Sequence, residues 1–155
     1  MVDYIQFPFE TLKYKSGDCD DLTILFASCL ETEGVDTILV TAPGHIFLMF
    51  YTGVGVEQIQ MLPFAKEMLV VLEDKIWIPV EVTRVSYSFL SAWYQGAEEY
   101  KKWEKEGKIG TINIHKAWAK YQTGTWRDVD FHPEVPAKDK ISQIVYKDLE
   151  TLTRK

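Results

Sequence analysis

The sequence is poor in cysteine, short of positive charge and free of long apolar runs. Its 155 residues hold two cysteines, Cys19 and Cys29. In one helix they would lie about 15 Å apart, too far for a disulfide, and two free thiols leave the cellular compartment open. The 17 basic residues are outnumbered by 23 acidic ones, and the formal net charge of -6 argues against nucleic acid as a partner. No apolar stretch reaches the roughly 18 residues that a membrane-spanning helix needs.

The composition is that of a folded protein. Hydrophobic residues make up 46% of the chain, aromatic residues 14% and charged residues 26%, which is typical of a globular rather than a disordered chain. The length suits a single domain with a sizeable core. We expect one domain over residues 1–155, with a core at about 5–121, a loop over 122–138 and a C-terminal helix over 138–154.

Residues 16–34 are the most informative stretch, and they predict one helix. Asp18 is typical of a helix N-terminus, and Gly34 stands where a left-handed C-terminal residue is usual. Apolar residues recur at helical spacing and predict one buried stripe: Leu22, Leu25, Phe26, Cys29 and Leu30. Cys19 falls in the first turn, where unpaired backbone N–H groups and the helix dipole favour the nucleophilic thiolate. Cys19 is therefore a candidate nucleophile, and the alternative is a small buried residue at a helix start.

Two later segments supply the partners that a cysteine nucleophile needs. His45 follows Gly44 at the start of an apolar strand, and Glu81 lies on a further strand. A thiol, a base and an orienting acid form the triad of cysteine hydrolases. We predict Cys19 as nucleophile, His45 as general base and acid, and Glu81 as the acid that orients the imidazole. The alternatives are a hydrogen-bonded core histidine and a rim carboxylate paired with Arg84 or a lysine.

These motifs together resemble the transglutaminase-like superfamily of papain-like fold. The resemblance rests on Gly17-Asp-Cys19-Asp-Asp21, on Gly44-His45 before a hydrophobic strand, and on Trp77-x-x-Val80-Glu81-x-Thr83. The segment Pro8-Phe-Glu-Thr-Leu12 before Lys15-Ser-Gly-Asp-Cys is also similar to microbial members, the transglutaminase-like cysteine proteases. The resemblance covers roughly residues 5–84. It implies acyl transfer at amide bonds of a protein or peptide substrate: peptide or isopeptide hydrolysis, deamidation or cross-linking.

The chain departs from the family pattern in two places. The third member of the family's triad is more often Asp, and Glu81 is one methylene longer; Asp74, in a predicted turn, is the alternative acid. Members usually carry a helical segment and an oxyanion-hole contributor upstream of the cysteine. Here Gln6 is the only amide side chain upstream, and its position matches no family motif. We therefore expect the chain to be a fragment of a larger protein, with further domains of the same chain as partners.

Acidic residues flank the cysteine. Asp18, Asp20 and Asp21 oppose a thiolate electrostatically, unless Asp18 caps the helix and the other two face its dipole. In some transglutaminase-like cysteine proteases the acids beside the cysteine bind Ca²⁺, so the resemblance implies Asp18 and Asp20 as calcium ligands. The remaining oxygens of the roughly six to eight that Ca²⁺ takes are not evident. The expected chemistry requires no cofactor, and a metal site of Cys19 and His45 alone is short of ligands.

The remaining elements follow from periodicity and turn residues. Strands are predicted over 36–42, 45–51, 68–72 and 76–83, and helices over about 88–107 and 111–121. Residues 1–15 predict a short strand or extended arm, and residues 52–55 a turn or loop. The aromatic stripe of the later helices predicts core packing, and the alternative is a peptide-binding groove lined by Trp93 or Trp126.

We therefore predict an α+β fold of papain-like, transglutaminase-like type. The N-terminal helix that carries Cys19 packs on an antiparallel sheet, and C-terminal helices cover the other face. The predicted function is that of a cysteine hydrolase or acyltransferase that works through a thioester. The alternative is a catalytically inactive binding or scaffold module, which keeps the fold without the chemistry.

Overall fold

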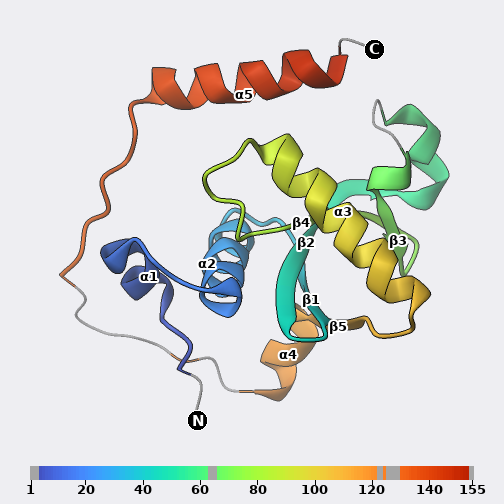
Figure 1. The fold of residues 1–155 in the computed structure, drawn as a ribbon, viewed down its shortest axis with the longest axis horizontal. Helices are drawn as coiled ribbons and strands as arrows, with labels where there is room; N and C mark the ends of the chain where they lie inside the picture. The colour runs from blue at the N-terminus through green and yellow to red at the C-terminus, as the bar shows by residue number, and fades with distance from the viewer. Residues whose placement is uncertain (1–3, 63–65, 122–123, 125–129, 154–155) are drawn as a thin grey trace.

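The computed structural model describes residues 4–62, 66–121, 124 and 130–153, and these form an α+β fold around one antiparallel sheet (Figure 1). The five strands stand in the order β3-β4-β2-β1-β5. Their bounds are β1 (Thr37–Ala42), β2 (His45–Gly55), β3 (Val70–Leu72), β4 (Lys75–Val80) and β5 (Gly110–Asn113). The helices are α1 (Pro8–Tyr14), α2 (Cys19–Thr32), α3 (Phe89–Lys105), α4 (Ile114–Lys120) and α5 (Lys138–Thr153), with 3-10 turns η1 (Val56–Met61) and η2 (Lys66–Met68).

A two-residue turn sets the start of β2. Ala42 of β1 pairs with His45 of β2, so only Pro43 and Gly44 connect the two strands. Gly44 has φ 69°, in the left-handed region that favours glycine. Proline and glycine therefore make His45 the first residue of the central strand, as the sequence predicts.

The β3–β4 hairpin is also confirmed. Glu73 and Asp74 form its turn with φ values of 51° and 57°, and Leu72 pairs with Lys75. Asp74 thus lies in a turn at the end of the hairpin, as its sequence context indicates. β2 is longer than expected, because residues 52–55 continue the strand through a register shift against β4.

Helices pack on both sides of the sheet. On one side Ala27 of α2 packs with Leu39 of β1, and Ile114 of α4 joins this cluster. On the other side Tyr100 of α3 packs against a cluster that includes Phe47 of β2. Helix α3 contacts both sides, because its Trp93 packs with Ile78 on the α2 side of β4. Helix α4 also lies on the side of α2, so the expected arrangement, with the C-terminal helices on the opposite face alone, is not observed.

Two segments differ from the sequence-based expectation. Residues 8–14 form helix α1 rather than a strand, because Pro8 is favoured at the first helical position and the Glu10 side chain accepts a 2.8 Å hydrogen bond from the Phe7 N–H. The next helix begins at Ile114, not near Thr111, because residues 110–113 pair with β1 as an edge strand and Asn113 caps the helix.

Helix α5 lies apart from the sheet and crosses above the start of α3 (Figure 1). Its Asp148 side chain accepts a hydrogen bond of 3.1 Å from the Phe89 N–H, at the first turn of α3. Among the described residues, no helix is long and apolar enough to cross a membrane.

Candidate functional site

Helix α2 presents one narrow stripe to the sheet, and Cys19 begins it. Thr23 is completely buried and Ala27 nearly so, and the side chain of Glu31 is shielded as well. Residues four apart lie on one face of a helix, so Cys19, Thr23, Ala27 and Glu31 form a single row. Cys19, at the N-terminal end of this row, is only partly buried.

The contacts of this row fix the direction of α2. Thr23 Oγ1 donates to the Ile46 carbonyl at 3.3 Å, near the start of β2. Two turns later Glu31 accepts hydrogen bonds from Thr37, whose partner on β2 is Phe50. The helix therefore advances in the same direction as β2. Cys19, one turn before Thr23, lies at the His45 end of that strand.

His45 and Glu81 form the closest side-chain pair of the site. His45 Nε2 lies 2.6 Å from Glu81 Oε2, and Glu81 is buried with 5% of its surface exposed. The other carboxylate oxygen, Oε1, accepts hydrogen bonds from the Thr83 N–H at 2.9 Å and from the Thr83 hydroxyl at 2.5 Å. A buried carboxylate with this many donors is held in one orientation. The predicted contact between Glu81 and His45 is present, so Glu81 is not a free rim carboxylate.

The backbone of Glu81 is held by α3. Its N–H donates to the Ala92 carbonyl at 3.0 Å. Gly96 permits this approach, since a Cβ at that position would lie 2.7 Å from backbone atoms of Pro79 and Val80. The glycine in the middle of α3 therefore lets the helix rest directly on the end of β4, just before the carboxylate.

Among the described residues, the structure shows no hydrogen bond between the Cys19 thiol and the His45 imidazole. Within the part of the chain that the structure describes, Glu81 is the hydrogen-bond partner of the His45 ring, and Nδ1 has none. The ring stacks on Phe47, with centroids 5.9 Å apart, on the side of the sheet opposite the one that contacts α2. A contact between Cys19 and Nδ1 would therefore form around the end of the sheet.

Asp21 holds the segment before Cys19 in place through hydrogen bonds. From the sequence we predict only that its charge faces the dipole of the helix. It is buried, and it accepts hydrogen bonds from the Gln6 N–H and Gln6 Nε2, both at 2.7 Å, and from the Asp18 N–H at 3.2 Å. Oε1 of Gln6 is buried without a partner. A Cβ on Gly17 would lie 2.8 Å from the Cβ of Asp21. The segment before Cys19 is thus tied to the first turn of α2, and the Asp-x-x-Asp spacing of a capping box was the available signal.

Asp18 is the N-cap residue of α2. Its side chain accepts from the Asp21 N–H at 3.4 Å. The pKa of Asp18 lies below its ordinary value, chiefly because of a side-chain hydrogen bond with Asp20 and also because of nearby backbone N–H groups. Among the described residues, no group of three or more acidic, histidine or cysteine side chains could hold a metal ion. The calcium ligation by Asp18 and Asp20 that the resemblance implies stays a prediction.

A second histidine repeats the hydrogen-bond pattern of His45. His115 Nε2 lies 3.0 Å from Glu31 Oε2, and the other oxygen of Glu31 accepts from the Thr37 N–H and hydroxyl. His115 also lies 3.5 Å from Asp36. This pair joins α4 to the C-terminal end of α2. The hydrogen bonds of His115, Glu31 and Thr37 repeat those of His45, Glu81 and Thr83. The difference is that Cys19 lies at the other end of α2.

One sequence-based expectation is wrong. Cys29 is exposed rather than part of a buried stripe, because the face of α2 on the sheet is the row of Thr23 and Ala27. The expected core packing of the aromatic stripe is confirmed for Trp93, which is 1% exposed and donates its indole N–H to the Met68 carbonyl at 2.6 Å, so the alternative of a groove lined by Trp93 does not hold. Trp126, the other aromatic residue expected at a groove, lies outside the described residues.

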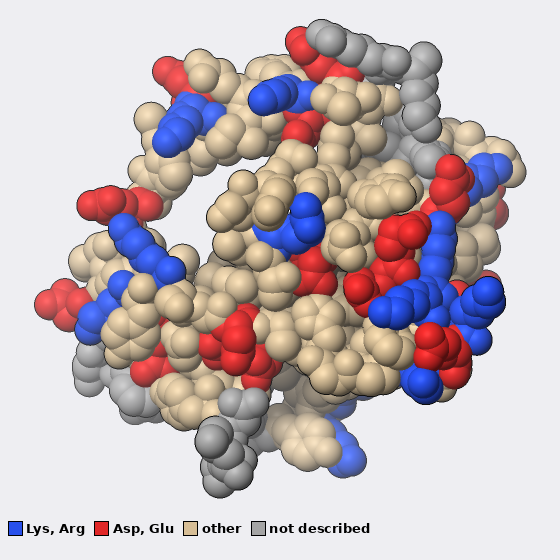
Figure 2. Space-filling view, viewed as in Figure 1, with Lys and Arg blue, Asp and Glu red and all other residues tan. Residues whose placement is uncertain are grey.

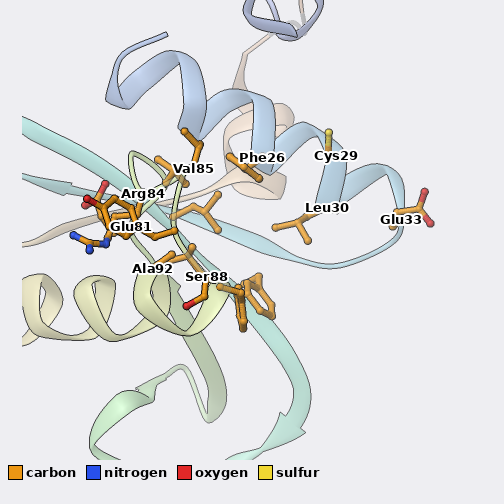
Figure 3. A pocket seen from close by; sticks show the side chains of 15 residues that line it. Phe26, Cys29, Leu30, Glu33, Glu81, Arg84, Val85, Ser88 and Ala92 are labelled. Atoms are coloured by element: carbon orange, nitrogen blue, oxygen red, sulfur yellow. The ribbon is translucent and has the colours of Figure 1, made fainter. Parts of the chain in front are cut away.

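A groove is nevertheless present beside Glu81. Its cavity is about 510 Å³ and lies between the C-terminal half of α2 and the segment that leads into α3 (Figure 3). The lining is mostly apolar, with Glu81 at one end; Cys19 and His45 do not line it. The apolar lining residues include Phe26, Leu30, Leu48, Phe50, Val80, Val82, Val85 and Phe89. Cys29 and Glu33 lie at its α2 margin (Figure 3).

The chain was compared with protein-family models, with curated proteins and with solved structures. None of the three comparisons found a match. The geometry of α2, His45 and Glu81 therefore carries the functional argument on its own.

Proposed function

We propose that the protein is a cysteine hydrolase or acyltransferase of papain-like, transglutaminase-like type that acts on amide bonds of a protein or peptide. Cys19 is the nucleophile, His45 the general base and acid, and Glu81 the residue that orients the imidazole. The observation that carries the proposal is the pair of His45 Nε2 and a buried Glu81 carboxylate, 2.6 Å apart, at the end of the sheet where α2 begins with a cysteine.

The chemistry follows from which atoms are already engaged. Because Glu81 holds Nε2, Nδ1 of His45 is the atom that accepts the thiol proton. The Cys19 thiolate attacks the amide carbon, and its own backbone N–H, at the first helical position, is a donor to the oxyanion. The C–N bond breaks, His45 returns the proton to the leaving amine, and a thioester remains.

The second half of the reaction decides the product. Water, deprotonated by His45, attacks the thioester and releases a carboxylic acid, which is hydrolysis or deamidation. An amine in place of water gives a new amide bond, which is cross-linking. In both cases the Glu81 carboxylate stabilises the imidazolium that forms in between, and the thiol is regenerated.

The second candidate function is a binding module that keeps this fold without the chemistry. The observation in its favour is the second pair, because His115, Glu31 and Thr37 share the same arrangement with no nucleophile beside them. The apolar groove next to Glu81 would then be the functional surface. The chain offers internal controls that separate the two functions.

Alkylation of the two cysteines tests the proposal. Native protein is treated with iodoacetamide from about pH 5 to about pH 9, and labelling of each cysteine is quantified by peptide mass spectrometry. We expect Cys19 to label faster than Cys29, because His45 takes up the thiol proton and leaves the more nucleophilic thiolate. Cys29 is exposed and is the control on the same helix.

Two histidine variants complete the experiment. His45→Ala should slow the labelling of Cys19, since the proposed proton acceptor is lost, and His115→Ala should leave it unchanged. Thermal unfolding of both variants shows that the fold persists. A Cys19 profile that matches Cys29, or that responds equally to both variants, would refute the catalytic function and favour the binding module.

A further inference from the structure

Helix α5 carries an apolar stripe that its own chain leaves largely uncovered. Ile141, Ile144, Val145 and Leu149 recur at helical spacing and are between 43% and 57% exposed. A lone helix of this length is marginal in water, and its stability ordinarily comes from packing of the apolar face. The stripe therefore requires a surface to pack on.

The C-terminal half of α5 already has such a surface. Leu152 packs on the cluster that contains Trp93, and Asp148 accepts the 3.1 Å hydrogen bond from the Phe89 N–H. These contacts lie at the rim of the groove, because Phe89 and its neighbours Ser88 and Ala92 line it. The N-terminal half of α5 stands clear of the body, and Figure 2 shows open space beneath it.

The groove matches the free half of α5 in polarity and charge. From Phe89 it extends past apolar residues of β2 and β4 to Phe26 and Glu33 on α2 (Figure 3). Ile144 and Ile141 precede Asp148 by about one and two helical turns, so a helix that pivots at Asp148 can lay them over the groove. Lys138 and Lys140 at the start of α5 then approach Glu33, and Arg84 lies at the acidic end of the helix. The opposite orientation would place acidic residues of α5 beside Glu33.

We infer that the groove is a helix-binding surface and that its occupant is the chain's own α5, which closes on it by pivoting about the contacts of Asp148 and Leu152. Closure buries the apolar stripe against Phe26 and Val85 and covers Cys29. It also covers the groove side of Glu81. The inference concerns the groove alone and does not depend on the proposed catalysis.

A disulfide between the groove and α5 reports closure directly. Cys29 is the native thiol at the groove margin, and Cys19→Ser removes the other. In this background Ile141→Cys and Ile144→Cys place a thiol on the apolar stripe. Gln143→Cys is the matched control, because it lies between the two in sequence and on the opposite side of the helix. Each protein is oxidised with copper phenanthroline at low micromolar concentration, and the products are separated by non-reducing electrophoresis.

We expect a monomeric cross-linked product in at least one of the two stripe variants, formed at least tenfold faster than in Gln143→Cys and at a rate independent of protein concentration. Circular dichroism shows that each variant is folded before oxidation. Cross-linking no faster than in the control would overturn the inference. A dimeric product whose rate rises with concentration would also overturn it and would assign the groove to α5 of a second copy.

Discussion

At the scale of single residues, Glu81 and Glu31 share one arrangement and differ in what surrounds the histidine. Each carboxylate is shielded from solvent. One of its oxygens pairs with a histidine Nε2, and the other accepts hydrogen bonds from a threonine N–H and hydroxyl. The His45 side chain is 25% exposed and that of His115 54%. The proposed base is therefore the better shielded of the two, and it is the one at the cysteine end of α2.

The threonines offer a matched test of orientation. Thr83→Val and Thr37→Val each remove one hydroxyl donor from a shielded carboxylate, and each should lower the free energy of unfolding by about 1–3 kcal/mol. Only Thr83→Val should slow Cys19 alkylation near pH 6, because only Glu81 orients His45. Urea unfolding and mass-spectrometric labelling measure the two effects. Equal effects on Cys19 labelling would mean that stability, not orientation, controls the thiol.

Asp18 should make the free energy of unfolding fall at acidic pH, because its pKa is lowered in the folded protein. Its folded-state pKa lies below the ordinary value of about 3.9, so charged Asp18 stabilises the fold above that pH, and the contribution is lost as the pH falls through the folded value. Asn also caps helices well but does not titrate. The difference in unfolding free energy between the native protein and Asp18→Asn should therefore shrink between about pH 6 and about pH 2, measured by urea unfolding.

The control for this experiment is Asp139→Asn, in the first turn of the exposed helix α5. The difference in free energy of unfolding between Asp139→Asn and the native protein should change less with pH than the same difference for Asp18→Asn. A difference for Asp18→Asn that widens on acidification would contradict the sign of the shift.

At the scale of elements, the contact between α3 and β4 depends on Gly96. Gly96→Ala improves helix propensity by roughly 1 kcal/mol, yet its Cβ meets the Pro79 and Val80 backbone at 2.7 Å. Overpacking of this kind costs about 1–3 kcal/mol, so we expect a net loss of stability together with slower Cys19 alkylation, because Glu81 follows Val80 directly. Glu98→Ala, on the exposed side of α3, should change stability by less than about 0.5 kcal/mol. A stabilised Gly96→Ala protein would contradict the close approach.

Local signals in the sequence were sufficient for the central elements. Pro43-Gly44 and the turn at Glu73-Asp74 define both hairpins. These signals are local, so they survive without knowledge of the tertiary structure.

Local sequence patterns did not predict features that depend on tertiary contacts, such as which face of a helix is buried. In α2 the row on the sheet uses Thr23 and Ala27, whose small size allows close approach, so counting large apolar residues selected Cys29 in error. At α1 the alternation of Phe7 and Phe9 predicted a strand. The segment is a helix instead, because Pro8 and Glu10 stabilise its first turn.

At the scale of the whole molecule, stability should be highest at the centre of the sheet. β2 is paired with β1 on one side and β4 on the other, whereas β3 and β5 are edge strands. Amide hydrogen exchange followed by mass spectrometry should therefore be slowest in residues 46–51 and faster in β5. Exchange in β5 as slow as in β2 would mean that the edge is covered by a partner.

The exposure of Cys29 has a practical consequence. A thiol at the margin of an apolar cavity is a natural anchor for covalent fragment screening, in which weak apolar ligands are retained by a reversible disulfide. The cavity would select among fragments by shape, and the anchor needs no engineered residue. Small molecules for this surface can therefore be sought from the structure alone.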